Sequence, residues 1–289
     1  MKPPPFSYHD PATVADAVGL LGRLENAKVL AGGQSLMPML NMRYVLPDHV
    51  VDINGIGDLS HIREDGDVLE IGGLTRQRDL EFSDVVKARC PLLHEAILNV
   101  GHRQTRNRGT VGGSLSHLDP SAEIPAVCAA QNAVIRVAGP DGEREIPFAE
   151  FPVAYMTPAL SENEILTGVR LPLWPAGHGS AFVEFSRRHG DFAIVAAAAL
   201  VELSGDGSLS RVSVTVSGVG PAPVRMTGME EALTGAQPTE ETFRSAAEAC
   251  RQIDALEDVH ASSSYRQHLA AVLARRALVS AAARAGGGA

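Results

Sequence analysis

Residues 109–125, GTVGGSLSHLDPSAEIP, contain the pattern on which the prediction of the fold rests. The stretch combines glycines, hydroxyl side chains and a carboxylate, a mixture that a core helix or strand rarely needs. Gly112 and Gly113 allow a close backbone approach and a positive φ, which a side chain would block. The hydroxyl groups of Thr110 and Ser114 stand beside peptide N–H groups that can point inward and form an anion-binding concavity. We therefore predict a loop that holds an anionic group.

A second glycine-rich segment, AGGQS at Ala31–Ser35, lies earlier in the chain. It follows the short apolar run 28–31, which predicts a strand. A Gly-Gly pair by itself usually marks only a turn. Two such segments, each with a hydroxyl residue after the glycines and an apolar run before them, predict the two halves of one phosphate clamp. The Gly-x-Gly-x-x-Gly fingerprint of a Rossmann fold is absent from this place.

Together these segments resemble the FAD-binding (medium) subunit of molybdenum hydroxylases, the carbon monoxide dehydrogenase medium-subunit and xanthine dehydrogenase FAD-domain family. Four blocks carry the resemblance, in the order in which the family has them: Ala31–Pro38 (AGGQSLMP), Arg106–Pro125 (RNRGTVGGSLSHLDPSAEIP), Glu164–Pro172 (EILTGVRLP) and Ala261–Leu269 (ASSSYRQHL). The resemblance extends over essentially the whole chain.

The resemblance implies an α+β fold of two domains. Residues 1–175 would form an FAD-binding domain of the PCMH (vanillyl-alcohol-oxidase-like) type, made of two α/β subdomains. Residues 176–289 would form a smaller domain of the carbon monoxide dehydrogenase flavoprotein C-terminal type, an antiparallel sheet plus helices. The stretch 173–179, LWPAGHG, is rich in Pro and Gly and supports a boundary at this point.

The resemblance also implies where FAD is bound. The expected cofactor-binding residues are those of the two glycine segments and two later positions: Leu30, Ala31, Gly32, Gly33, Gln34, Ser35, Leu36, Thr110, Val111, Gly112, Gly113, Ser114, Glu123 and Leu166. In relatives the acidic residue at the Glu123 position, often the shorter Asp, contacts the polar part of the flavin, and the residue at Leu166 lies against it. The family often has a flavin-contacting lysine near the position of Glu184, and this sequence does not have it.

Composition narrows the class of protein. The chain has 289 residues and a formal net charge of −9, which argues against a nucleic-acid-binding surface. No apolar run approaches the roughly 18 residues of a membrane span, and no secretory signal is visible, so we expect a cytoplasmic protein. The isolated Cys90, Cys128 and Cys250 cannot supply the thiolates of an iron–sulfur cluster. No metal site is expected, since His117 has no neighbouring ligand.

Apolar residues at helical spacing predict several helices. One covers residues 11–24 and is capped by Asp10, another covers 92–100, and Thr75 is expected to cap a short helix after Gly72 and Gly73. Thr239 begins a helical pattern that continues to Ile253. Ser262–Ser264 begins a last helix with the expected apolar stripe Tyr265, Leu269, Val272, Leu273 and Val279. Residues 286–289 are expected to fray.

Alternation of apolar and polar residues predicts the strands. They are expected at 50–53, 68–71, 133–137, 164–171 and 209–217, with a hairpin turn at 139–142. The alanine-rich run 194–203 fits a helix or a strand, and we take it as a strand beside 209–217 in one antiparallel sheet. The basic run 102–108 is compatible with a solvated loop or with a source of positive potential beside the second glycine segment.

No acid–base pair and no nucleophile with a partner stands out, so no catalytic residue is predicted and the chemistry is expected to belong to a cofactor. The resemblance implies a subunit that binds one FAD and passes electrons to an external acceptor. It implies a small partner subunit with two [2Fe-2S] clusters and a large molybdopterin subunit, assembled as a dimer of heterotrimers.

Two other functions remain open at this point. One is a self-contained FAD-dependent oxidase of the vanillyl-alcohol-oxidase type, for which the chain after Pro172 is short. The other is a non-catalytic scaffold in which the glycine segments are only turns. The substrate of the assembled enzyme is open among carbon monoxide, a purine and an N-heteroaromatic compound, and Glu184 favours the last. Because a separate dinucleotide fingerprint is missing, a quinone, a cytochrome or another carrier is favoured over NAD as acceptor.

Overall fold

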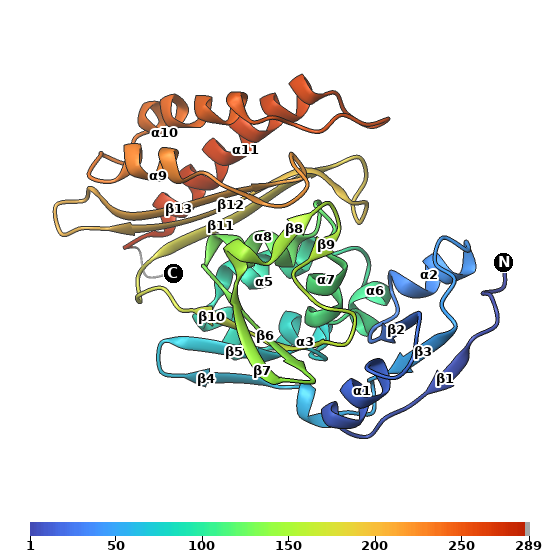
Figure 1. Cartoon of the computed structure of the whole chain (residues 1–289). Helices are drawn as coiled ribbons and strands as arrows, with labels where there is room; N and C mark the ends of the chain where they lie inside the picture. Colours follow the sequence, from blue (N-terminus) through green and yellow to red (C-terminus); the bar gives the residue numbers. More distant parts are fainter. Residues whose placement is uncertain (287–289) are drawn as a thin grey trace.

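The computed structural model describes residues 1–286. Residues 287–289, part of the terminus expected to fray, lie outside the described residues. Within the described range the chain forms sheets of three, five and four strands and a two-stranded ribbon, with helices packed around them (Figure 1). This mixture confirms the predicted α+β class.

The first sheet is small and parallel. Its strands are β1 (Ser7–His9), β2 (Ala27–Leu30) and β3 (His49–Asp52), in the order β1-β3-β2. Helix α1 (Val14–Leu21) buries Ala17, Val18 and Leu21 in one core cluster with Val51. Helix α2 (Leu36–Asn41) follows the first glycine segment. The sheet therefore fixes the point from which that segment leaves β2.

Helix α1 is shorter than predicted, and the prediction of its cap was wrong. The hydroxyl of Thr13 accepts a hydrogen bond from the peptide N–H of Asp16 (3.1 Å), so Thr13 rather than Asp10 is the N-cap. Gly22 follows the last helical residue. A hydroxyl that can reach the N–H three residues later is the strongest local start signal, and Thr13 supplies it.

The second sheet is antiparallel and its central strand comes late in the chain. The strand order is β4 (Ile62–Asp65), β5 (Val68–Gly72), β10 (Ile165–Pro172), β6 (Val134–Gly139) and β7 (Gly142–Pro147). Strand β10 is buried at Ile165, Val169 and Leu171, which explains why it takes a central place. The pairing of Gly139 with Gly142 confirms the predicted hairpin. A 3₁₀ turn, η1 (Gly57–Leu59), precedes β4.

Helices fill the chain between β5 and β6. They are α3 (Gln77–Phe82), α4 (Asp84–Arg89), α5 (Pro91–Asn99), α6 (Arg103–Arg108), α7 (Val111–His117) and α8 (Glu123–Ala130). Leu93 and Ile97 of α5 are buried, as predicted. The predicted cap at Thr75 was wrong: its hydroxyl donates a hydrogen bond to the carbonyl of His61 (2.8 Å), and α3 begins only at Gln77. Thr75 instead joins the segment after β5 to the start of β4.

The third sheet, antiparallel, is formed by β11 (Gly179–Ser186), β12 (Ala193–Leu203), β13 (Leu209–Ser217) and β14 (Val224–Arg225). Before it come η2 (Phe148–Glu150) and the ribbon of β8 (Pro152–Ala154) and β9 (Thr157–Pro158). The interpretation of 194–203 as a strand is confirmed. Its sequence has no clear period because both faces of β12 are buried.

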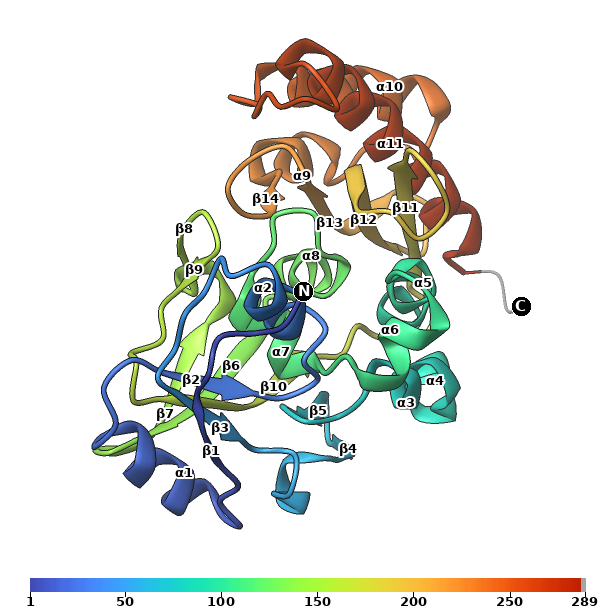
Figure 2. The same cartoon turned by 90° about the vertical axis from the view of Figure 1, so that its right-hand side faces the viewer.

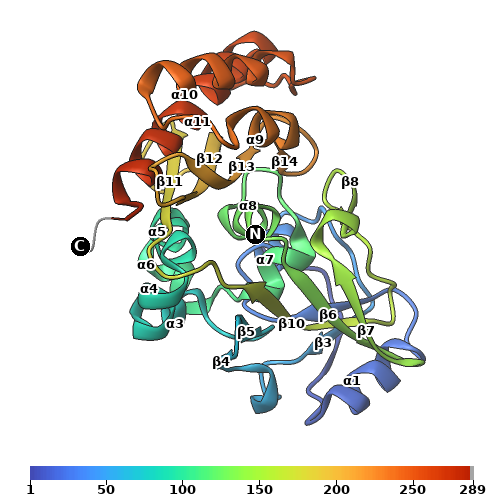
Figure 3. The ribbon, with the colours of Figure 1, turned by 90° about the vertical axis from the view of Figure 1, so that its left-hand side faces the viewer.

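Figure 3 shows α9 (Thr227–Leu233), α10 (Glu240–Ala247) and α11 (Ser263–Arg284) on one side of this sheet, with α5 and α8 on the other. Glycine permits the tightest contact: a Cβ on Gly179 would lie 1.8 Å from the carbonyl oxygen of Ala281 in α11. On the opposite face Ala198 and Phe182 share a core cluster with Leu115 and Phe151. The third sheet is thus packed directly against the rest of the chain.

The C-terminal helices begin where predicted and differ in detail. Thr239 and Ser262 are side-chain N-caps of α10 and α11. The pattern expected to continue to Ile253 changes at Glu248 to a 3₁₀ helix, η3 (Glu248–Gln252). Tyr265 and Val279 were wrongly placed in the apolar stripe, since they are 41% and 40% exposed; small alanines pack against the sheet in their place. Within residues 1–286 no helix is both long and apolar enough to cross a bilayer.

Candidate functional site

The first glycine segment is an open turn between β2 and α2. Gly33 has φ of +71°, a conformation that strains any residue with a side chain. Among residues 1–286, no hydrogen-bond acceptor faces the peptide N–H groups from Gly32 to Leu36, while the Gln34 side chain donates to the carbonyl of Gly32 (3.2 Å). A run of unpaired N–H groups is an anion-binding feature. The N–H groups of this segment are therefore available to an anionic ligand.

The second glycine segment is a helix, and the prediction of a loop there was wrong. Thr110 caps α7 by accepting a hydrogen bond from the N–H of Gly113 (3.0 Å). The N–H groups of Val111, Gly112 and Ser114 donate to Thr75 O, Gly73 O and Thr110 O, respectively. None of these N–H groups is therefore free for a ligand, and neither Gly112 nor Gly113 has a positive φ.

Close packing explains the glycine at position 112. A Cβ there would lie 2.8 Å from the carbonyl oxygen of Gly73 and 3.0 Å from its Cα. Gly73 in turn lies against β10, because a Cβ on it would be 2.5 Å from the carbonyl oxygen of Leu166. The glycines thus let α7 lie directly on the sheet, which sequence patterns alone do not distinguish from a ligand loop.

The two glycine segments are in contact. A Cβ on Gly32 would lie 2.3 Å from the carbonyl oxygen of Arg108 and 2.9 Å from the Cα of Gly109. In the view of Figure 2 α2 lies in front of α7, and Figure 1 shows α6 between these two helices. The structure therefore brings together the two stretches that the sequence analysis paired, through their backbones.

The basic run 102–108 contains the whole of α6, so it is a helix and not a loop, although most of its side chains are exposed to solvent. Arg106 is 7% exposed, and its Nε lies 2.9 Å from Glu81 Oε2. Its guanidinium also donates to the carbonyl of Val100 (3.0 Å). Arg106 therefore holds α6 against α3, whereas Arg108 is exposed next to the first glycine segment.

Asp52 and Asn54 lie below the first glycine segment, at the end of β3. Burial alone would raise the pKa of Asp52, but hydrogen bonds from Asn54 and Tyr8 and the charge of Arg108 hold that pKa below its usual value. The Asn54 side chain donates to the carbonyl of Ala31 (2.7 Å). These contacts were not predicted, since no motif joins Asn54 to the glycines.

Two carboxyl groups interact electrostatically, one at the start of α8 and one in β11. Glu123, in the first turn of α8, is 8% exposed; burial and then the neighbouring Glu184 raise its pKa to about 8. Burial raises the pKa of Glu184 to about 7, and its Oε2 is buried without a hydrogen-bond partner among the described residues.

The same face of the third sheet carries further unpaired polar atoms. Ser217 Oγ and Thr215 Oγ1 are fully buried, and neither has a partner within residues 1–286. Strand register places Glu184, Ala196 and Ser217 in one row across the sheet. The N–H of Gly218 donates to the carbonyl of Pro120 (2.9 Å), which sets the start of α8 beside this row. Buried polar groups without partners fit a polar ligand or water at this place.

Leu166 lies in the main core and is 5% exposed. It is at an irregularity of β10, where the pairing with β6 skips from Leu166 to Gly168. The skipped residue, Thr167, has a buried hydroxyl that lacks a partner in the described part of the chain. The structure therefore puts Leu166 behind α7, next to a further unsatisfied polar atom.

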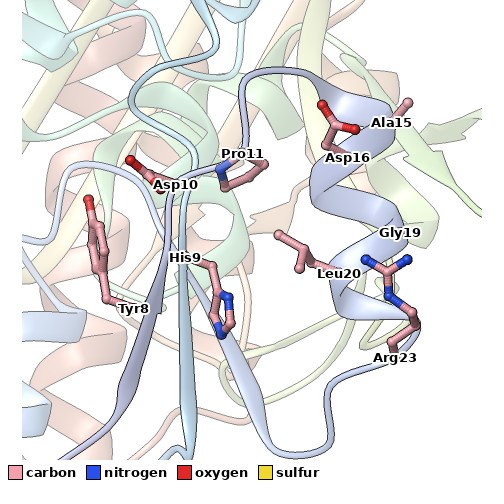
Figure 4. A pocket seen from close by; sticks show the side chains of 9 residues that line it. All are labelled: Tyr8, His9, Asp10, Pro11, Ala15, Asp16, Gly19, Leu20 and Arg23. Atoms are coloured by element: carbon pink, nitrogen blue, oxygen red, sulfur yellow. The ribbon is translucent and has the colours of Figure 1, made fainter.

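Two surface pockets lie outside the glycine segments. One, of about 470 Å³, is bounded by β1 and α1, and Figure 4 shows Tyr8, His9, Leu20 and Arg23 among its side chains. Another, of about 650 Å³, includes Glu81 and His102. Neither includes a residue of the glycine segments, so the candidate site rests on the unpaired backbone and side-chain groups.

Comparison with known proteins identifies the family. Residues 4–174 match the model of the FAD binding domain in molybdopterin dehydrogenase, and residues 180–281 match that of the CO dehydrogenase flavoprotein C-terminal domain. The chain is 40% identical to the 6-hydroxypseudooxynicotine dehydrogenase complex subunit alpha of Paenarthrobacter nicotinovorans, over 99% of this chain and 97% of that one.

Solved structures agree. A chain of carbon monoxide dehydrogenase from Hydrogenophaga pseudoflava is similar with a TM-score of 0.96 and 39% identity, covering 99% of this chain and all of that one. A chain of quinoline 2-oxidoreductase from Pseudomonas putida 86 has a TM-score of 0.95 and 32% identity, with 99% and 100% covered. These matches favour a subunit of a larger enzyme over a self-contained oxidase or a scaffold. The chain belongs to the FAD-binding medium subunits of molybdenum hydroxylases.

Proposed function

We propose that this subunit passes electrons from [2Fe-2S] clusters of a small partner subunit, through FAD, to an external acceptor. The clusters receive them from a large molybdopterin subunit, and the three chains assemble as a dimer of heterotrimers in the cytoplasm. The names of the relatives as medium chain and complex subunit support an assembly of several chains. Residues 1–175 serve as the FAD-binding domain and 176–289 as the C-terminal domain.

One observation carries the site assignment: the unpaired N–H groups from Gly32 to Leu36, beside the exposed Arg108. The diphosphate of FAD is the part of the cofactor that needs such donors. Leu30, Ala31, Gly32, Gly33, Gln34, Ser35 and Leu36 hold the diphosphate in our proposal. The second glycine segment packs against the first and supports it in our proposal; its residues are Thr110, Val111, Gly112, Gly113 and Ser114. The N–H groups of the last four already donate to other protein atoms, so they do not bind the diphosphate.

The flavin end of the cofactor fits the polar row between α8 and the third sheet. With a pKa of about 8, Glu123 keeps its proton at pH 7 and can donate a hydrogen bond to an acceptor on the ligand. Ser217 and Glu184 offer further unsatisfied groups, and Leu166 backs the site. FAD supplies the electron transfer when bound, and the chain's residues bind it, orient it and exclude water.

The substrate pocket of the assembled enzyme lies on the molybdopterin subunit in this proposal. The acceptor is a quinone, a cytochrome or another carrier, in keeping with the missing dinucleotide fingerprint. The purified subunit alone should therefore fail to reduce artificial dyes with carbon monoxide, a purine or an N-heteroaromatic compound. Brisk turnover without partners would overturn this proposal.

The direct test is an absorption spectrum of the purified chain before and after acid precipitation. A flavin spectrum that passes to the supernatant as FAD is expected, because no covalent attachment is proposed. Flavin retained in the pellet would contradict the proposal. If the chain is purified without flavin, it is titrated with FAD, and failure to bind would refute the assignment.

A further inference from the structure

Arg76 occupies the junction of the two glycine segments. Its Nη1 donates to the carbonyl of Arg108 (2.5 Å) and its Nη2 donates to Asn54 Oδ1 (2.6 Å). Asn54 Nδ2 then donates to the carbonyl of Ala31 (2.7 Å). A continuous chain of hydrogen bonds therefore runs from the end of α6 to the start of the first glycine segment.

The carbonyl of Arg108 is where the two segments touch. Arg76 donates to this oxygen, and the same oxygen prevents any Cβ at Gly32, which would lie 2.3 Å away. The backbone of Arg76 is also held, since it forms a bridge to Thr110 at the cap of α7. Loss of the guanidinium would remove the hydrogen bonds that hold the Arg108 carbonyl and Asn54 in place at this contact.

Asn54 is fixed from its other side. Its peptide N–H and its side chain both donate to Asp52 Oδ1 (2.9 and 2.6 Å), and Asp52 Oδ2 accepts from the hydroxyl of Tyr8 (2.7 Å). The amide can therefore present its oxygen to Arg76 and its nitrogen to Ala31 in a single orientation. Because each side chain in this hydrogen-bond network is held in one orientation, the network fixes the distance between the carbonyl of Arg108 and that of Ala31.

Two cations, Arg76 and Arg108, lie close enough to repel each other here, although the carboxylates of Asp52 and Asp79 partly offset their charge. Within residues 1–286, neither Arg76 nor Arg108 has a carboxylate partner at salt-bridge distance, although Arg76 is partly buried. Burial, and then the charge of Arg108, lower the pKa of Arg76. Two cations next to a run of unpaired N–H groups form a place where an anion relieves repulsion.

We propose that Arg76, acting through Asn54, is a positioning residue that sets the spacing of the two glycine segments and so determines how tightly they hold the diphosphate of FAD. This inference rests on the proposed assignment of the diphosphate to the first glycine segment. The planar guanidinium is needed because it reaches two acceptors at once, which an ammonium group does not reproduce.

The test compares FAD, ADP and riboflavin as ligands of the full-length subunit freed of flavin. Arg76→Met should weaken binding of FAD and of ADP about tenfold or more, the loss expected for a charged hydrogen-bond donor. Riboflavin, which has no diphosphate, should bind as it does to the unchanged protein. The FAD affinity of Arg76→Lys should lie between those of Arg76→Met and the unchanged protein, since lysine restores the positive charge but cannot donate to both acceptors at once.

Three further variants separate the explanations. Asn54→Ala should weaken FAD binding as Arg76→Met does, and the double variant should be little worse than either, because both break one hydrogen-bond network. Arg89→Met removes the surface pair with Glu64 (2.8 Å) on α4 and should leave FAD binding unchanged. Gly32→Ala tests the diphosphate assignment itself, because its Cβ enters the contact with Arg108.

The outcomes are distinct. Loss of FAD binding in Gly32→Ala with normal binding in Arg76→Met refutes the role of Arg76 and leaves the diphosphate assignment intact. Normal binding in Gly32→Ala refutes the assignment, and the role of Arg76 with it. Equal weakening of FAD and riboflavin in Arg76→Met also refutes the proposal, because it indicates general damage to the fold. If Arg76→Met does not fold, Arg76→Lys and Asn54→Ala carry the same comparison.

Discussion

The buried pair Glu123 and Glu184 should make the flavin-free subunit less stable as pH rises. In both residues the folded state raises the pKa above the ordinary value of 4.5, to about 8 and about 7. The native protein therefore keeps protons that the unfolded chain releases. Stability falls with pH wherever the native state binds more protons, here from about pH 4.5 up to the folded pKa values.

The proposed substitution is Glu123→Gln, which keeps the shape of the side chain and removes its ionisable carboxyl group. For a carboxyl that titrates at 4.5 when unfolded and at about 8 when folded, the linkage relation gives a loss of about 2.5 kcal/mol between pH 5 and pH 7. The variant should escape this loss. The variant's free energy of unfolding minus that of the unchanged protein should therefore increase by about 2.5 kcal/mol from pH 5 to pH 7.

The assay is urea unfolding of the flavin-free subunit at half-unit steps from pH 5 to pH 8. Taking the difference between the two proteins cancels the titrating groups that do not interact with Glu123. Glu231→Gln, at an exposed position of α9, is the matched control for replacing a carboxylate by an amide. A difference between Glu123→Gln and the unchanged protein that does not vary with pH would refute the reasoning, because Glu123 would then titrate as it does in the unfolded chain.

Three further predictions concern packing and capping. Gly179→Ala should lower stability by about 2 kcal/mol or more in denaturant unfolding, since the new methyl group overlaps the backbone of α11; an unchanged midpoint would contradict this contact. Ser262→Ala should cost about 1 kcal/mol through loss of the α11 cap, whereas Ser264→Ala should cost little; equal effects would argue against capping. Arg106→Met should cost about 2 kcal/mol by removing the charged hydrogen-bond partner of the partly buried Glu81, yet leave FAD affinity unchanged in a titration; weakened FAD binding in a folded variant would indicate that α6 contributes to the FAD site.

Much of the fold was predictable because local rules decide it. The alternation of Val212, Val214 and Val216 predicted β13, and a helix-period stripe predicted α5. Thr239 and Ser262 predicted the starts of two helices, because a hydroxyl that caps the first turn acts over three residues. The quoted blocks of sequence also sufficed to indicate the family, since they recur in order along the chain.

The candidate site was predictable only in part. The two glycine segments lie in contact, and the glycines of the second stand in the first turn of a helix, where their N–H groups are already hydrogen-bonded. Gly112 is a packing glycine because Gly73 lies 2.8 Å from where its Cβ would be, and the sequence around either residue contains no sign of the other. A glycine that admits a ligand and one that admits another backbone have the same local pattern.

Tertiary structure alone decided the contacts between distant segments. Arg76 meets Asn54 and the carbonyl of Arg108 across separations of 22 and 32 residues, and Arg106 meets Glu81 across 25. It also brought Glu123 into the field of Glu184, buried the first and partly buried the second, which gives each carboxyl group an unusual pKa. The sequence by itself determined the elements and the family, because periodicity and capping act within a few residues. Spacing, burial and charge at the site came from packing, because they depend on which segments meet.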